Sequence, residues 1–129
     1  MREAAAHAVR IATLAKRYGR LEALKGVDLE VGPGEAFGLV GANGAGKTTL
    51  IKCMLDLAAY DRGEIAIFGL DARRPNARAK LAYLPERFLP PHYLRGEEFL
   101  RLLHELAGAR RDAKREAQLL EELELEREA

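Results

Sequence analysis

The first third of the chain alternates apolar and polar residues in the manner of β-strands. Residues 9–14 alternate loosely, and residues 23–31 place leucine and valine between charged side chains, with an interruption at Gly26. The stretch 18–20 (YGR) between them has turn composition. The pattern therefore predicts two strands joined by a turn.

Three short apolar runs follow. Residues 36–40 (AFGLV) are continuously apolar, which is typical of a strand buried on both faces. Residues 65–68 predict a further strand that ends at Gly69, and residues 81–84 form a third run, which Pro85 cuts.

Helical spacing appears over residues 47–59 and again in the last third of the chain. Residues 99–106 place Phe99 and three leucines on one face, with Gly108 as a stop signal. Asp112 is a capping residue for a second helix, whose apolar stripe continues to Leu123. Strands that alternate with helices indicate an α/β architecture.

Composition narrows the class of protein. The 129 residues include 21 basic and 20 acidic side chains, 48% hydrophobic residues and one cysteine. This balance predicts a single globular domain and gives no electrostatic reason to expect a nucleic-acid partner. One cysteine excludes an internal disulfide and suits a reducing compartment, and no apolar run approaches the length of a membrane span.

A glycine-rich segment, residues 41–48 (GANGAGKT), fits the pattern G-x-x-x-x-G-K-[ST] between an apolar run and a helical pattern. Glycines allow successive backbone N–H groups to converge on one anion, and a helix N-terminus favours phosphate. Lys47 is expected at the β- and γ-phosphates, and the Thr48 hydroxyl at Mg²⁺. The segment predicts a nucleoside triphosphate site formed by Gly41, Asn43, Gly44, Ala45, Gly46, Lys47, Thr48 and Thr49.

Other candidate residues favour structural roles. Asp71 follows an apolar run, but Gly69 breaks that run first, so we do not expect Asp71 to be a metal ligand. Cys53 is expected in the core. The arginines of residues 73–78 are expected on a solvated face. The three histidines lack the spacing of a metal site.

The flanking sequence separates the classes of phosphate-loop protein. No N-K-x-D element for guanine is present, and the arginine-rich lid of a small-molecule kinase has no clear candidate. The chain instead resembles the ATP-binding domain of ABC transporters over residues 9 to about 125. The resemblance rests on the glycine-rich segment together with residues 18–19 (YG), 23–27 (ALKGV), 33–35 (PGE), 63–65 (GEI), 69–71 (GLD) and 82–86 (AYLPE).

The resemblance implies a fold and a set of ligands. The expected fold is an α/β P-loop core of the RecA-like type, with an N-terminal antiparallel β portion. Residues 9–90 correspond to the β-rich nucleotide-binding part, and residues 91–129 to the start of the helical subdomain. The implied ligands are ATP and Mg²⁺. Tyr18 resembles the aromatic residue that stacks on adenine, and Glu86 stands where most members have a glutamine that contacts Mg²⁺ and the attacking water.

The family's signature loop, its acidic strand with the catalytic glutamate and its switch histidine are absent from the sequence. Family members hydrolyse ATP as pairs beside a membrane permease, at the inner face of the plasma membrane. We therefore expect the nucleotide-binding half of a transport ATPase, truncated before these motifs and unable to hydrolyse ATP alone. No catalytic residue is assigned except Glu86, at the glutamine position. A soluble ABC-type ATPase of translation or DNA repair, or a nucleotide-binding fragment without catalysis, are the alternatives.

Overall fold

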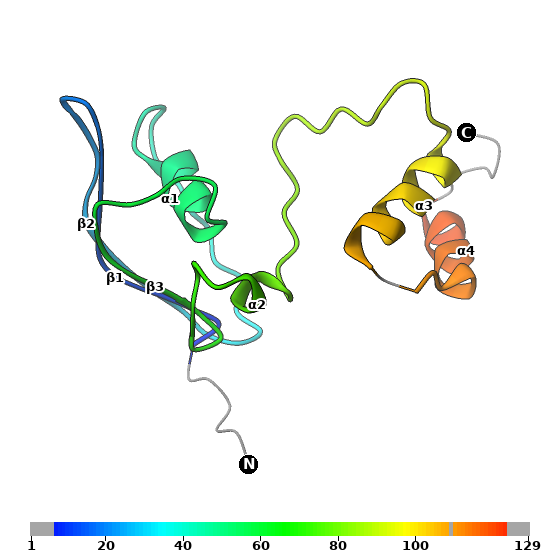
Figure 1. The fold of residues 1–129 in the computed structure, drawn as a ribbon, viewed down its shortest axis with the longest axis horizontal. Helices are drawn as coiled ribbons and strands as arrows, with labels where there is room; N and C mark the ends of the chain where they lie inside the picture. The colour runs from blue at the N-terminus through cyan, green and yellow to red at the C-terminus, as the bar shows by residue number, and fades with distance from the viewer. Residues whose placement is uncertain (1–6, 109, 124–129) are drawn as a thin grey trace, which may run out of the picture. The chain divides into compact units, whose positions relative to one another are not determined.

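The computed structural model describes residues 7–108 and 110–123, which belong to two units, Met1–Ala82 and Tyr83–Ala129 (Figure 1). The first unit holds an antiparallel sheet and two helices, and the second holds a pair of helices.

The sheet of the first unit has four strands in the order β2-β1-β3-β4. Their bounds are β1, Val9–Tyr18; β2, Leu21–Val31; β3, Arg62–Ile67; and β4, Leu70–Asp71. Each neighbouring pair is antiparallel, and β1 and β2 form a hairpin in which Tyr18 pairs with Leu21. The strands predicted over residues 9–14, 23–31 and 65–68 and the turn at residues 18–20 are therefore confirmed, with β1 four residues longer than predicted.

The middle of β1 is irregular, and Gly63 of β3 packs directly against it. Thr13 has a positive φ of 45°, its N–H donates to the Asp28 carboxylate at 2.8 Å, and the pairing registers shift on both sides of it. A Cβ on Gly63 would lie 2.6 Å from the Ala12 carbonyl oxygen and 2.6 Å from the Leu14 Cα. Because no other residue fits such an approach, β3 can pair with β1 here only through a glycine.

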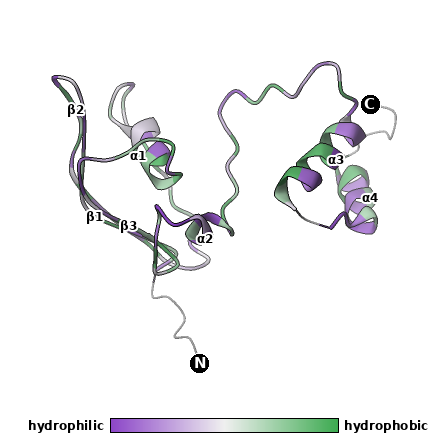
Figure 2. Cartoon of the chain, in the orientation of Figure 1, coloured by the Kyte–Doolittle hydropathy of each residue, from purple (hydrophilic) through white to green (hydrophobic). Residues whose placement is uncertain are grey.

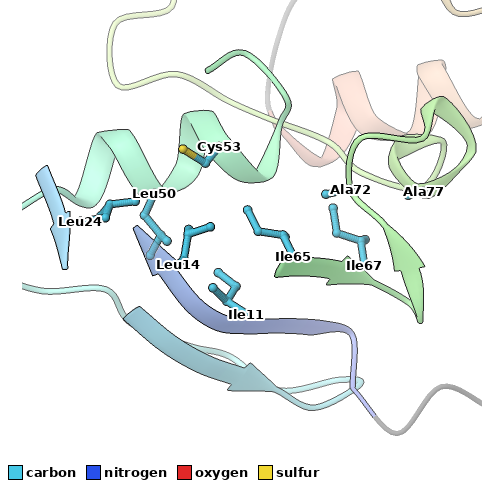
Figure 3. Close-up of a cluster of buried hydrophobic side chains, with 9 residues drawn as sticks. All are labelled: Ile11, Leu14, Leu24, Leu50, Cys53, Ile65, Ile67, Ala72 and Ala77. Atoms are coloured by element: carbon cyan, nitrogen blue, oxygen red, sulfur yellow. The ribbon is translucent and has the colours of Figure 1, made fainter. Parts of the chain in front are cut away.

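The core lies between the sheet and helix α1, Lys47–Met54. Leu50 of α1 points toward the strands, and Cys53 of α1 belongs to the same buried cluster (Figure 3). The buried cluster comprises Ile11, Leu14, Leu24, Leu50, Cys53, Ile65, Ile67, Ala72 and Ala77. Burial raises the pKa of the Cys53 thiol, which keeps it in the neutral form of a core residue. The prediction of a core cysteine is confirmed.

Helix α1 begins where the sequence predicts and ends five residues before Ala59. Asp56 has a positive φ of 58°, a left-handed conformation that no α-helix continues through. The guanidinium of Arg78, in the one-turn helix α2 (Pro75–Arg78), forms an ion pair with Asp56 at 3.1 Å and donates to the Ala72 carbonyl. The expectation that Arg78 lies on a solvated face is therefore wrong, because its side chain joins the end of α1 to the segment after β4.

The strand predicted over residues 36–40 does not form, and the apolar run of residues 81–84 is not a strand either. Residues 36–40 and 81–84 lie outside the four strands that the structure describes. The apolar side chains of residues 36–40 are exposed, and Val40 is 94% exposed to solvent. An apolar run becomes a strand only when another backbone satisfies its N–H and C=O groups. Such partner strands are absent from the sheet of residues 7–108 and 110–123.

The second unit contains α3, Gly96–Ala107, and α4, Ala113–Glu122. Gly108 ends α3 with a φ of 61°, and the Asp112 carboxylate accepts from the Arg115 N–H at 3.0 Å at the start of α4. Both predicted helix signals are confirmed, and Leu123, the last residue of the predicted apolar stripe, follows α4 directly and is exposed. Figure 2 shows apolar and polar residues along both helices, neither of which buries a side chain fully. The described part of the chain contains no helix with the length and apolar character of a membrane span.

We predict that Gly63→Ala destabilises the first unit far more than Gly26→Ala does. Both glycines lie in strands with positive φ, but a Cβ at Gly26 of β2 meets open space. In the control variant, Gly26→Ala, only the left-handed backbone conformation lowers the free energy of unfolding, by about 1 kcal/mol. Gly63→Ala adds the clash with β1, so we expect its total loss to be on the order of 3 kcal/mol. Urea unfolding followed by circular dichroism measures both, and equal losses would contradict the packing described for Gly63.

Candidate nucleotide-binding site

The glycine-rich segment, residues 41–48, runs directly into the N-terminus of α1. Gly46 is the N-cap with a φ of 91°, and its carbonyl accepts the first helical hydrogen bond, from the Leu50 N–H at 2.8 Å. No side chain caps this end of the helix, and its first turn contains no acidic residue. Backbone N–H groups and the positive end of the helix dipole therefore remain available to an anion.

Gly46 also holds the segment against the sheet. A Cβ at this position would lie 2.5 Å from the Ala23 carbonyl oxygen and 3.0 Å from Leu24 Cδ2, both on β2. Because a glycine is required by both the positive φ and the close approach, β2 determines where the phosphate-binding segment can lie. The helix that follows then starts from a fixed point on the sheet.

Lys47 extends its side chain back over the beginning of the same segment. Its Nζ donates to the carbonyl oxygens of Gly41 at 2.6 Å and Ala42 at 2.8 Å. The Ala45 N–H closes a turn onto the Ala42 carbonyl at 3.1 Å. The ammonium group is thus held within the segment, where it can add positive charge to the backbone N–H groups.

Tyr18 lies at the end of β1, on the hairpin that also carries Ala23. Tyr18 is 47% exposed, so part of the residue is accessible to a ligand. The hairpin and the glycine-rich segment lie at the same end of the first unit, because Ala23 is in contact with Gly46 (Figure 1). The structure therefore brings Tyr18 and Lys47 into one region of the molecule.

Lys16 is a residue of this region that was not predicted from the sequence. Its Nζ lies 4.9 Å from the centroid of the Tyr18 ring. The only signal in the sequence is a spacing of two residues on a strand, which is too common to identify a contact.

The predicted polar residues of the segment lie at its surface or in the first turn of α1. Asn43 is exposed in the turn and Thr48 is exposed in α1, while Thr49 is half-buried. Within residues 7–108 and 110–123, no three His, Cys, Asp or Glu side chains form a group that could hold a metal ion. The exposed Thr48 hydroxyl is an oxygen donor of the kind that Mg²⁺ accepts beside phosphate and water ligands.

Glu86 belongs to the second unit. It is exposed in a bend between residue 84 and α3, outside the helices and strands. Its predicted contacts with Mg²⁺ and the attacking water remain a prediction. Asp71, by contrast, has a structural role: Arg73 donates to its carboxylate at 2.7 Å and lowers its pKa to about 2.

Comparison with protein families gives one match that covers most of the chain. The family described as ABC transporter matches residues 24–129. Among curated proteins, the chain is 41% identical over 125 residues to the daunorubicin resistance ATP-binding protein DrrA2 of Streptomyces coeruleorubidus. That alignment covers 92% of this chain and 38% of DrrA2, so the chain spans well under half of this relative.

Solved structures agree with the sequence match. An ATP-binding subunit of an ABC transporter superposes with a TM-score of 0.79 and 36% identity, over 93% of this chain and 52% of that one. An ABC transporter ATP-binding protein from Pyrococcus furiosus gives a TM-score of 0.78 and 25% identity, over 93% and 58% of the two chains. These structures confirm the predicted α/β P-loop fold with its antiparallel β portion.

We predict that Gly46→Ala weakens Mg²⁺-ATP binding about 10-fold or more, the effect of losing one N–H contact to a charged phosphate. The new Cβ would displace the segment from the Ala23 carbonyl. Isothermal titration calorimetry measures the dissociation constant. Gly34→Ala is the matched control, because Gly34 also has a positive φ but open space around it. If the two variants have the same dissociation constant for Mg²⁺-ATP, the contact of Gly46 with β2 does not position the segment.

Proposed function

This chain belongs to the ABC transporter family, and we propose that it binds Mg²⁺-ATP as the nucleotide-binding part of a transport ATPase. The observation that carries the proposal is the geometry of residues 41–48. A glycine-only contact with β2 fixes the segment, α1 offers uncapped N–H groups to an anion, and the Lys47 ammonium lies among its carbonyls. Each of these features favours a polyphosphate.

In this proposal the first unit binds both ends of the nucleotide, the triphosphate and the base. The triphosphate contacts residues 41–46, Lys47 and Thr49, and the adenine stacks on Tyr18. An exposed aromatic face suits a base because stacking needs no particular hydrogen-bond pattern. The contact between Gly46 and β2 keeps the two parts of the site on one rigid support.

Mg²⁺ is proposed to be held by the Thr48 hydroxyl, with phosphate oxygens and water as its other ligands. Glu86, at the family's glutamine position, is proposed as a Mg²⁺ ligand from the resemblance alone. Bound there, the ion would neutralise charge on the β- and γ-phosphates. Glu86 differs from the family's glutamine by a negative charge, which also suits a metal ligand. Residues 9–90 are proposed as the nucleotide-binding part of the domain, and residues 91–129 as the start of the helical subdomain.

Coupling to transport is proposed from the relatives. DrrA2 is named for resistance to daunorubicin, and other relatives are named Nod factor export and methionine import ATP-binding proteins. We infer a membrane permease and a second ABC ATPase subunit as partners, and a location at the inner face of the plasma membrane. Members of the family are ATPases; for residues 1–129 alone we propose ATP binding without turnover, because their sequence offers no general base for the attacking water beyond Glu86.

We predict that Lys47→Ala lowers the affinity for Mg²⁺-ATP about 100-fold, the effect of losing a charged contact to phosphate. Lys52→Ala is the matched control, because Lys52 is exposed later in the same helix. This substitution removes the same charge at a position away from the glycine-rich segment. Isothermal titration calorimetry compares the two variants with the unmodified chain. Equal affinities for the two variants would contradict the proposed site.

The purified chain is also expected to release no phosphate from ATP above background. A coupled phosphate assay at saturating Mg²⁺-ATP measures this rate. Steady phosphate release that disappears in Lys47→Ala would show that the chain hydrolyses ATP on its own and would overturn this part of the proposal.

A further inference from the structure

The ring of Tyr18 is in contact with a cation on one of its faces. The Nζ of Lys16 lies 4.9 Å from the ring centroid, within the range of a cation–π interaction. Lys16 is half-buried, whereas Tyr18 is 47% exposed. The aromatic residue proposed for the base is therefore held by a neighbour whose own freedom is restricted.

Lys16 also belongs to the part of the sheet that supports the phosphate-binding segment. It pairs with Leu24 of β2, and Leu24 contacts Gly46. Lys16 thus lies near both proposed parts of the nucleotide site.

An ammonium on one face of a tyrosine ring leaves the opposite face for stacking. It also restricts rotation of the ring, so that less conformational freedom is lost when a planar ligand binds. We propose that Lys16 is a positioning residue for the nucleotide base, which holds Tyr18 in the orientation that stacks on a purine. This inference rests on the proposed function. It adds that Lys16 determines how much the adenine base contributes to the affinity for ATP.

The test compares two ligands that share a triphosphate and differ in the base, Mg²⁺-ATP and Mg²⁺-tripolyphosphate. Lys16→Met keeps the length of the side chain and removes its charge. We expect it to weaken ATP binding about 3-fold, the effect of a partly exposed cation–π contact, and to leave tripolyphosphate binding unchanged. Lys16→Arg is expected to restore ATP affinity, because a guanidinium also stacks on an aromatic face.

Lys25→Met is the matched control, since Lys25 is an exposed lysine on β2, and it should alter neither affinity. Lys16→Met in a Tyr18→Leu background should have no further effect on ATP, because Lys16 acts through the ring. Circular dichroism checks that each variant is folded. If Lys16→Met does not fold, the affinities of Lys16→Gln for ATP and tripolyphosphate are measured in its place.

Three outcomes would overturn the proposal. Equal weakening of ATP and tripolyphosphate would make Lys16 a general charge for phosphate, and an unchanged ATP affinity would show that the contact has no role. An effect that persists in Tyr18→Leu would show that Lys16 does not act through the ring. If the unmodified chain binds neither ligand, or if Lys47→Ala leaves both affinities unchanged, the proposed function itself fails and this inference fails with it.

Discussion

The close approach of Gly46 to the carbonyl of Ala23 is the contact on which the proposed site depends. It joins a flexible, glycine-rich segment to a hydrogen-bonded sheet, and it does so where a side chain cannot fit. A preorganised anion site needs its N–H groups held before the ligand arrives, because ordering them on binding would reduce affinity. The β1–β2 hairpin thus supplies both the support for the phosphates and the aromatic ring proposed for the base.

Helix α1 transmits this constraint to the core. Its N-terminus faces the proposed phosphate site, while Leu50 and Cys53 are buried in the cluster that also contains residues of β1, β2 and β3. Its other end is held by the ion pair between Arg78 and Asp56. These contacts anchor α1 to the sheet and to the segment after β4, while its uncapped N-terminus presents the positive end of the dipole to an anion.

The apolar runs of residues 36–40 and 81–84 show that local composition alone does not make a strand. Both runs have strand composition, and neither is part of the sheet that the structure describes. Most of their apolar side chains are exposed, Val40 and Leu84 the most, while Leu81 is half-buried against the core cluster. The same composition in residues 65–68 does produce a strand, because β1 is available there to pair with it. A pairing partner, and not composition, therefore decides which apolar run becomes a strand.

The sequence by itself determined the elements whose causes are local: the hairpin, the start of α1, the caps of α3 and α4, and the phosphate-binding segment with Lys47. Turn residues, capping groups and glycine conformations act over a few residues, so they can be read directly. Only the tertiary structure decided that Gly46 meets β2, that Gly63 meets β1, and that Lys16 covers one face of Tyr18. The two glycine contacts depend on which segments the fold brings together, for Gly63 beside the irregularity of β1 at Thr13, and such long-range geometry leaves no pattern in a single sequence. The contact of Lys16 with Tyr18 spans two residues of one strand, a spacing too common to identify it.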